Sequence, residues 1–195
     1  MKINLIGSTW QKGNDHGSYT QHASGKASCR KMKTQTASAV RIINAPAGLV
    51  YKLIADYRNT HPLILPKPYF LSLDVEEGGF GERTIIRFQM RILGQKRSFR
   101  ALITEPEPGC VLQETGLSAN ISTTFTVLSL GHKNHAKVTI MTVLKDRGFI
   151  GGFLAKLMLQ KIYAQELTLL AGLAETLSQP MHAASENQTL SISSQ

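Results

Sequence analysis

The chain has 195 residues, of which 42% are hydrophobic, and it carries a formal charge of +9 at pH 7. This length suits one domain with a sizeable core and leaves no room for a second full domain. No stretch approaches the ~20 apolar residues that span a bilayer. Residues 1–37 hold six Lys/Arg and one acid, and residues 38–178 hold sixteen and eleven. About half of the excess charge therefore lies in an N-terminal tail and does not by itself indicate nucleic-acid binding.

Both ends of the chain lack the periodicity of helices and strands. Residues 1–36 are rich in Gly, Ser, Thr, Gln and Lys, which predicts a disordered or non-native N-terminal extension. Met32 stands just before the patterned sequence, so either Met1 or Met32 is the true start. Residues 179–195 contain a helix-stopping proline and then turn polar, which predicts a disordered C-terminal tail. The folded domain is expected to span residues 37–178.

The two cysteines, Cys29 and Cys110, lie far apart and belong to no metal-binding or redox motif. We interpret them as reduced thiols. The N-terminal stretch "MKINLIGSTWQKGND" has only a short apolar run and lacks the small-residue cleavage pattern of secreted proteins. We therefore expect a cytoplasmic protein.

The patterned sequence starts with "SAVRIINAP", which is typical of a strand. Asn44 and Pro46 then predict the start of a helix, with Asn44 as its cap and Pro46 in its first turn. In "AGLVYKLIAD" the apolar residues recur at helical spacing, so one face is buried. The next segment, "IADYRNTHPLILPKPYF", contains three prolines. We interpret it as a stiff elbow that acts as a lid over a cavity mouth.

A run of strands follows, beginning with residues 70–75. In "RTIIRFQMRIL" and "KRSFRALITE" apolar and polar residues alternate, which is the period of a sheet with one face toward water. Gly94–Gln95 predicts the tight turn between these two strands. Three further strands are predicted in "CVLQETG", "NISTTFTVLSL" and "HAKVTIMTVLK". Because the connections have hairpin length, the sheet should be mostly antiparallel.

The patterned region closes with an amphipathic helix predicted over residues 149–178. At ~100° per residue, one side of this helix is apolar and holds Leu159, Ile162, Tyr163, Leu169, Leu170, Leu173 and Leu177. Glu166 falls in the middle of this apolar stripe. The sheet must cover its apolar face, and this helix is long enough to do so.

The chain has five landmarks in a characteristic order: "VRIINAPAGLVYKLIADYRNTHPLILP", "VEEGGFGERTIIRF", "EPEPGCVLQET", "STTFTV" and "YAQELTLLAGLAE". Over residues 38–178 it resembles the SRPBCC superfamily, most of all the polyketide cyclase/dehydrase and lipid-transport group, which is related to START domains and the birch-pollen allergens. The resemblance implies an α+β helix-grip fold. In this fold an antiparallel sheet of about seven strands wraps around a long C-terminal helix, two short helices follow the first strand, and a pocket lies between sheet and helix.

The same resemblance implies a wide range of activities. Members of the superfamily include aromatase/cyclases, ligand carriers, coenzyme Q-binding proteins and cochaperone-like activators, so the fold does not settle the function. The candidate ligand contacts of this chain are Tyr57, His61, Phe88, Met90, Arg97, Phe99, Phe125, Tyr163 and Glu166. An adaptable Met and several Phe suit an apolar ligand, and a core filled by these same side chains is the alternative.

His61 and Glu166 are weak catalytic candidates. A general base needs a partner that orients its ring, and Asp56 is the nearest acid to His61 in the sequence. The alternatives for His61 are a contact at the pocket entrance and a solvated loop histidine. Glu166, if buried, must be neutral, paired or open to a wet cavity. Three alternatives stay open for it: an internal bridge that joins Arg97 to Glu166 or Glu114, a polar anchor for a ligand head group, and helix curvature that turns it into solvent.

Four basic side chains, Arg87, Arg91, Lys96 and Arg100, gather on the expected outer face of one hairpin. A solvated strand face explains them without a partner, and weak contact with a membrane surface or RNA is the alternative. The segment "GGFGER" lacks the lysine and the following helix of a phosphate loop. No GxSxG motif and no metal-binding histidine pattern occurs, so we expect no cofactor, no metal and no DNA partner.

Three function classes remain open. The favoured one is binding, for transport or sequestration, of a small hydrophobic or aromatic molecule such as a lipid, quinone or polyketide, with Tyr57, Tyr163 and Glu166 as polar contacts. The second is a lyase-like enzyme of the polyketide cyclase/dehydratase type, which needs a carboxylate or histidine with a perturbed pKa at the pocket. The third is a regulatory partner that uses the basic hairpin and whose binding weakens with salt.

Overall fold

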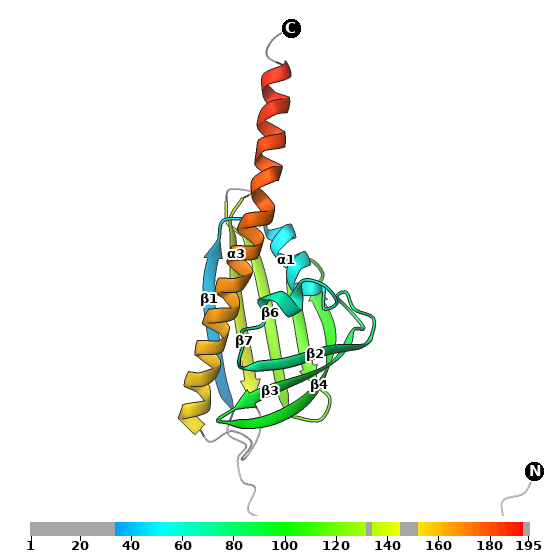
Figure 1. Cartoon of the computed structure of the whole chain (residues 1–195), viewed down its shortest axis with the longest axis vertical. Helices are drawn as coiled ribbons and strands as arrows, with labels where there is room; N and C mark the ends of the chain where they lie inside the picture. The colour runs from blue at the N-terminus through cyan, green and yellow to red at the C-terminus, as the bar shows by residue number, and fades with distance from the viewer. Residues whose placement is uncertain (1–33, 132–133, 145–151, 193–195) are drawn as a thin grey trace, which may run out of the picture. The chain divides into compact units, whose positions relative to one another are not determined.

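A seven-stranded antiparallel sheet and a long C-terminal helix dominate the computed structural model (Figure 1). The structure describes residues 34–131, 134–144 and 152–192, and in the last helix it describes the side chains of residues 156–179. The elements are β1 (Gln35–Ile43), α1 (Ala47–Ala55), α2 (His61–Ile64), β2 (Phe70–Glu77), β3 (Ile85–Ile92), β4 (Gln95–Glu107), β5 (Val111–Gly116), β6 (Ile121–Ser129), β7 (Ala136–Leu144) and α3 (Gly152–Ile192). The predicted α+β helix-grip architecture is therefore confirmed.

Apart from the pairing of β1 with β7, the sheet joins strands that are neighbours along the chain. Its order is β1-β7-β6-β5-β4-β3-β2, and the neighbouring strands pair antiparallel throughout. β1 pairs with β7, with Ala39 opposite Ile140. Hairpin connections need no crossover helix, so α3 is left to cover the apolar face of the sheet.

The β3–β4 hairpin shows the predicted alternation, with Phe88 paired to Phe99. Its tight turn is Leu93–Gly94 and not the predicted Gly94–Gln95, because β4 already begins at Gln95. Leu93 and Gly94 have φ angles of 49° and 80°, and a type I′ turn requires positive φ at both central residues. A leucine in this conformation carries a steric cost that glycine avoids.

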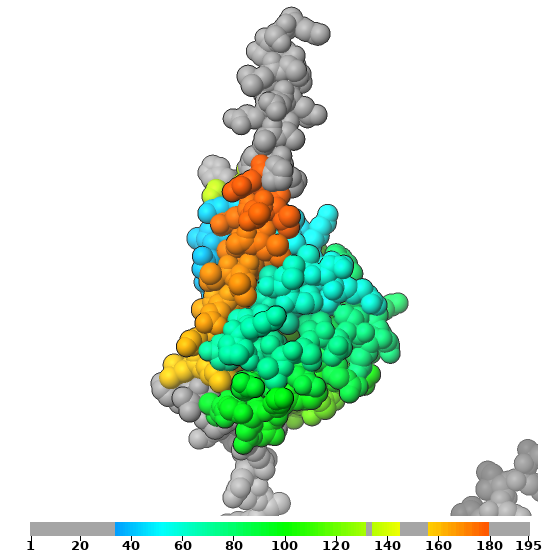
Figure 2. Space-filling model, viewed as in Figure 1, coloured from blue at the N-terminus to red at the C-terminus, as the bar shows by residue number. Residues whose placement is uncertain are grey.

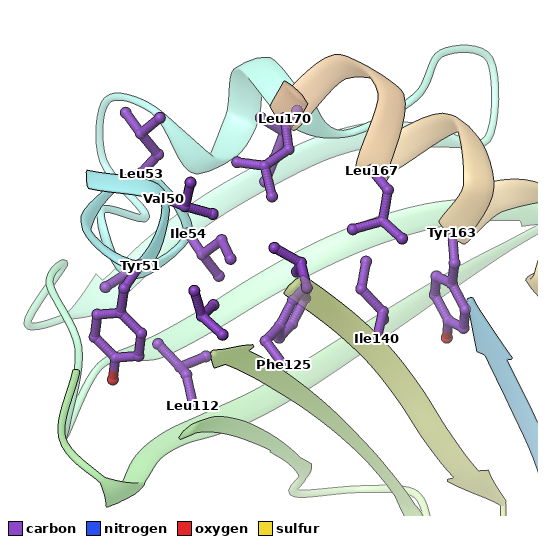
Figure 3. Close-up of a cluster of buried hydrophobic side chains, with 14 of the residues drawn as sticks. Val50, Tyr51, Leu53, Ile54, Leu112, Phe125, Ile140, Tyr163, Leu167 and Leu170 are labelled. Carbon is purple, nitrogen blue, oxygen red and sulfur yellow. The ribbon is translucent and has the colours of Figure 1, made fainter. Parts of the chain in front are cut away.

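The hydrophobic core lies between α3 and the sheet and continues beneath α1 (Figure 3). In Figure 3 the side chains of Tyr163, Leu167 and Leu170 extend from α3 toward Phe125 and Ile140 on the strands. All five are at most 5% exposed. Burial of such apolar surface is the main favourable contribution to folding, and here it fixes α3 on the sheet.

Helix α3 differs from the predicted helix in its length and in part of its buried face. Its backbone is helical from Gly152 to Ile192, so it continues past the predicted end at residue 178. A proline removes one hydrogen bond of the helical ladder but does not force the helix to end. On the buried face, Leu167 is 1% exposed, whereas Leu169 and Leu177 are each 43% exposed. The buried stripe is thus shifted around the helix relative to the prediction, toward Leu167, Ala171 and Ala174.

Helix α1 begins without the predicted Asn44 cap. Pro46 occupies the N-cap position, and no side chain caps the helix. The backbone N–H of Asn44 instead donates a hydrogen bond to Oε1 of Glu175 on α3, at 3.0 Å. The start of α1 is therefore held by a tertiary contact with α3 rather than by a local capping bond.

The predicted elbow lies between α1 and β2, and part of it is the one-turn helix α2. Figure 2 shows this cyan-to-teal segment beside the orange part of α3, and α2 contacts α3 directly. Within the elbow, Thr60 Oγ1 donates to the Leu53 carbonyl at 2.7 Å, and the N–H groups of Tyr69 and Phe70 donate to the Pro66 carbonyl at 3.2 Å. These local bonds hold the elbow in one conformation over the inner face of the sheet.

The glycine-rich segment Gly78–Arg83 is tied to the end of α1. The Tyr57 N–H donates to the Gly79 carbonyl at 2.9 Å, and the Gly81 N–H donates to the Ala55 carbonyl at 3.0 Å. Both of these glycines have positive φ, 131° at Gly79 and 57° at Gly81, which L-residues with side chains rarely adopt. These two backbone hydrogen bonds attach the loop to the end of α1.

Candidate functional site

An apolar cavity lies between α3, the elbow and the inner face of the sheet. Its apolar lining consists of Leu65, Phe70, Leu73, Phe88, Met90, Ile92, Phe99, Ile121, Phe125 and Leu159. Its polar lining consists of His61, Glu114, Thr123, Tyr163 and Glu166. A mostly apolar concave site with a few convergent polar groups is the usual form of a small-molecule pocket.

The cavity is narrow in this conformation. Its free volume is about 50 Å³. This volume corresponds to a few water molecules. Phe70, Leu73 and Phe88 line the cavity and are only partly buried, so their side chains can move without disturbing the fully packed core. A larger ligand therefore requires side chains at the cavity to shift.

The structure brings together most of the predicted ligand contacts. His61, Phe88, Met90, Phe99, Phe125, Tyr163 and Glu166 all line the cavity. Tyr57 lies behind the lining, where its ring stacks on His61 with the ring centroids 4.3 Å apart. Arg97 lies on the exposed part of β4 and is not among the side chains that line the cavity.

Glu166 is buried, with 2% exposure, and its Oε1 atom has no hydrogen-bond partner among the described residues. Burial raises the pKa of this carboxyl well above its ordinary value, and the nearby carboxyl of Glu114 raises it further. The prediction that helix curvature turns Glu166 into solvent is therefore wrong. The raised pKa favours the protonated acid, which faces the cavity and can donate one hydrogen bond and accept others.

Glu114 on β5 is the second carboxyl of the cavity. Its Oε1 atom accepts a hydrogen bond from the Tyr57 hydroxyl at 2.7 Å. Burial raises the pKa of Glu114 to about 7, although the Tyr57 hydrogen bond acts in the opposite direction. The buried Tyr57 hydroxyl has a pKa well above its ordinary value, because burial and the Glu114 carboxylate both disfavour the phenolate. Tyr57 is therefore a fixed donor that orients Glu114.

His61 is buried, with 2% exposure, so the prediction of a solvated loop histidine is wrong. Its Nδ1 lies 2.7 Å from the Ile54 carbonyl, and an N–H at this position donates to that oxygen. Its Nε2 lies 3.8 Å from Oε1 of Glu114 and thus faces the cavity as an acceptor. Burial lowers the pKa of His61 to about 4, so the ring is neutral at pH 7. A backbone carbonyl, and not the carboxylate of Asp56, orients the ring.

Asp56 has a different role at the end of α1. Its Oδ1 atom accepts hydrogen bonds from the backbone N–H groups of Arg58 and Asn59 at 3.1 and 3.0 Å. Its backbone carbonyl accepts from the His61 N–H at 2.8 Å. Asp56 therefore shapes the turn that leads into α2.

Tyr163 contributes its ring to the cavity, while its hydroxyl is already engaged. The hydroxyl is hydrogen bonded to Thr142 Oγ1, which lies 2.8 Å from Thr123 Oγ1. Burial raises the pKa of Tyr163 above its ordinary value, so the phenol is neutral. These three hydroxyls form a chain that runs from α3 to β7 and β6 and satisfies its own polar groups.

The predicted bridge from Arg97 to Glu166 does not form. Arg97 donates to Gln95 Oε1 at 2.7 Å near the exposed start of β4. Alternation places Arg97 on the inner face with Phe99, but its side chain is exposed, although Met90 opposite it on β3 is buried. The internal bridge is thus excluded as the explanation of the buried Glu166.

The basic hairpin is also less cationic than predicted. Arg87 and Arg100 both form ion pairs with the carboxylate of Glu76 on β2. These pairs lower the pKa of Glu76 below its ordinary value. Of the four basic side chains, Arg91 and Lys96 are left without an acidic partner among the described residues.

Sequence reasoning missed several side chains of the cavity. Thr123 could have been found, because it shares the inward face of β6 with Phe125, two positions along. Phe70 and Leu73 could not have been found from alternation, because the pairing of β2 with β3 shifts register between Phe70 and Ser72. This irregularity lets two residues an odd number of positions apart line the same cavity.

Two further searches concern metals and membranes. Among the described residues, no group of three or more His, Cys, Asp or Glu side chains is placed to hold a metal ion. Within the same residues, no helix is both long and apolar enough to span a membrane.

Comparisons with known proteins give similarity in structure but not in sequence. No protein-family model matches the chain, and no curated protein matches its sequence. Among solved structures, the KanY protein is 23% identical with a TM-score of 0.65, over 74% of this chain and 99% of that one. The Zhui aromatase/cyclase from Streptomyces is 16% identical with a TM-score of 0.59, over 73% of this chain and 94% of that one.

A START superfamily protein from Mycobacterium smegmatis is also similar, with 14% identity and a TM-score of 0.59 over 73% of this chain and 98% of that one. At such identities the likeness establishes the fold. The chain has the helix-grip fold that START superfamily proteins and aromatase/cyclases share. The predicted resemblance to the SRPBCC superfamily is thus confirmed at the level of the fold.

Proposed function

We propose that this protein binds a small hydrophobic or aromatic molecule in the cavity between the sheet and α3, and thereby carries or sequesters it. The observation that supports the proposal is the buried Glu166, whose Oε1 lacks a hydrogen-bond partner among the described residues although it faces an otherwise apolar cavity. A buried polar atom without a partner is costly, and a ligand that bonds to it removes the cost. The aromatic lining supplies contact area for the rest of the ligand.

The test is native mass spectrometry of the freshly purified protein, followed by solvent extraction and identification of released compounds. Uptake of naphthalene, a neutral aromatic probe, is measured by fluorescence on the same preparation. We expect a retained apolar compound, uptake of the probe, or both. A protein that retains nothing and takes up no probe contradicts the proposal.

Two matched variants place the binding in the cavity. Leu159→Trp fills the cavity, because Leu159 lines it and is 4% exposed. Leu157→Trp adds the same side chain two positions away, where Leu157 is 45% exposed and does not line the cavity. We expect the first variant to lose binding and the second to keep it. Circular dichroism checks the fold, and Ile121→Trp is a second blocking variant.

An enzyme of the cyclase or dehydratase type is the second candidate, and a specific observation favours it. Glu114 has a pKa of about 7 and faces the cavity beside the neutral His61 and the protonated Glu166. Groups that titrate near neutral pH suit general acid–base chemistry. Loss of turnover in Glu166→Gln or Glu114→Gln, with the fold and ligand affinity unchanged, would support the enzyme over the carrier.

A further inference from the structure

The two carboxyls of the cavity come from opposite walls. Glu166 extends from α3 and Glu114 from β5, and both line the same apolar space. They are close enough for the charge of Glu114 to raise the pKa of Glu166. A ligand in this cavity therefore lies beside two carboxyl groups. The side chains around these carboxyls determine which ligands can bind there.

Among the described residues, no cationic side chain lines the cavity. Its other polar members are His61, Thr123 and Tyr163, and all three are engaged elsewhere or neutral. His61 is uncharged, with Nδ1 bonded to the Ile54 carbonyl. The hydroxyls of Thr123 and Tyr163 are joined through Thr142. Apart from the single hydrogen bond from Tyr57 to Glu114, these groups give the carboxyls no donor, so their oxygen atoms can accept further hydrogen bonds.

We infer that the polar end of the ligand is a protonated amine, which lies between Glu166 and Glu114 while an aromatic or short aliphatic group lies among the phenylalanines of the cavity. This inference rests on the proposed function. An ammonium group brings three N–H donors and the positive charge that the two acids lack. A hydroxyl brings one donor and no charge, and a carboxylate adds a third acid. A buried ion pair is favourable only when its hydrogen bonds are also satisfied, and two facing carboxyls meet that condition.

A matched set of probes tests the inference. The probes are 2-phenylethylamine, 2-phenylethanol and phenylacetate, which share a phenyl ring and differ in the polar end. Titration calorimetry at pH 6 measures their affinities. We expect the amine to bind roughly tenfold more tightly than the alcohol, which corresponds to one extra charge-assisted contact. We expect phenylacetate to bind more weakly than both.

Proton release is the second measurement. At pH 6 the groups that face Glu166 are neutral in the free protein, namely Glu114, His61, Tyr57 and Tyr163. The amine is already protonated, so pairing with Glu166 ionises this carboxyl and sends its proton to the buffer. Calorimetry in two buffers of different ionisation enthalpy should give about one proton released per amine bound. The alcohol should release none.

Two variants complete the experiment. Glu166→Gln keeps the shape and cannot ionise, so we expect it to lose both the preference for the amine and the proton release while still binding 2-phenylethanol. Glu175→Gln, on the same helix but outside the cavity, should behave as the unaltered protein. If Glu166→Gln does not fold, the probe ranking and proton release of the unaltered protein still decide the question.

Failure of this inference differs from failure of the proposed function. If 2-phenylethanol binds the unaltered protein as tightly as the amine, or if the amine binds without proton release, the cavity binds apolar molecules but the amine inference is wrong. If no probe binds, the amine inference is also wrong, and the naphthalene and extraction measurements decide the proposed function separately.

Discussion

The Tyr57 hydroxyl donates a hydrogen bond to Oε1 of Glu114 at 2.7 Å, inside the protein and just behind the cavity. Tyr57 is 0% exposed, and the Glu114 side chain is 13% exposed. This bond holds one carboxylate oxygen toward the core and leaves the other free to face the cavity. The hydrogen bond therefore sets both the orientation and the pKa of the Glu114 carboxyl, which a ligand in the cavity would contact.

Replacement of Tyr57 by Phe tests this control. Because the hydroxyl donates to the carboxylate and so lowers its pKa, we expect the pKa of Glu114 to rise above its value of about 7. The free energy of unfolding should fall by about 1–3 kcal/mol, since a buried acceptor loses its partner. Carbon-detected NMR titration of the glutamate carboxyls measures the pKa. An unchanged titration of Glu114 would contradict the assigned role of Tyr57.

The two cavity carboxyls predict that stability falls as the pH rises from about 4.5. Their pKa values are higher in the folded than in the unfolded protein, so the folded state binds more protons above this pH. For Glu114 the fall ends near its folded pKa of about 7. His61 acts in the opposite direction, because its lowered pKa makes stability rise between about pH 4 and 6.5. Each carboxyl that is protonated in the folded protein and ionised in the unfolded one lowers stability by about 1.4 kcal/mol per pH unit.

Urea denaturation at several pH values measures this slope. Glu166→Gln and Glu114→Gln should each flatten it, because glutamine does not titrate. Glu175→Gln is the control, because it removes a carboxylate of the same helix outside the cavity, and the glutamine oxygen can still accept the Asn44 N–H bond. A slope that stays the same in both cavity variants would show that other groups cause the pH dependence.

Phe88 should control how fast a ligand enters and leaves. Its ring stacks on Phe99 with the centroids 5.3 Å apart and lies 6.1 Å from that of Phe70. In Phe88→Leu both ring contacts are lost, at about 0.5–1.5 kcal/mol each, and the lining becomes more mobile. We expect stopped-flow fluorescence to show faster exchange of naphthalene. Phe80→Leu, at a position that is 58% exposed, should leave the rate unchanged.

Leu93→Asn should stabilise the protein through the β3–β4 turn. Asparagine adopts positive φ more easily than leucine, and Asn-Gly is a preferred type I′ pair. We expect a gain of about 1 kcal/mol in the free energy of unfolding. Leu93 is 49% exposed, so little buried surface is lost. Leu93→Ala is the matched control, because alanine keeps the unfavourable φ. Equal stability of the two variants would contradict this explanation.

The sequence supports the fold better than it supports the site. Alternation in the β3 and β4 segments depends on local side-chain periodicity, so the hairpin and its facing pair Phe88 and Phe99 were predictable. Glu166 was also predictable as an anomaly, because it interrupts an apolar stripe. Arg97 shows the limit of the same method, since alternation gives the face on which a residue lies and not whether its side chain is buried.

The position of His61 could not be predicted for a different reason. Its burial depends on the Ile54 carbonyl, on stacking with Tyr57 and on an edge contact with Phe125, whose ring centroid is 5.8 Å away. Phe125 is sixty-four positions further along the chain and meets His61 only after the sheet has formed. The sequence around the elbow therefore does not indicate this contact.

The backbone hydrogen bonds between α1 and the glycine-rich loop also connect this loop to His61. His61 is bonded through Nδ1 to Ile54 near the end of α1, and the next residue, Ala55, accepts the Gly81 N–H. A ligand that displaces the His61 ring therefore pulls on the same helical turn that holds the loop. We therefore expect a ligand that displaces His61 to change the amide hydrogen-exchange rate of Gly81, although the loop does not line the cavity.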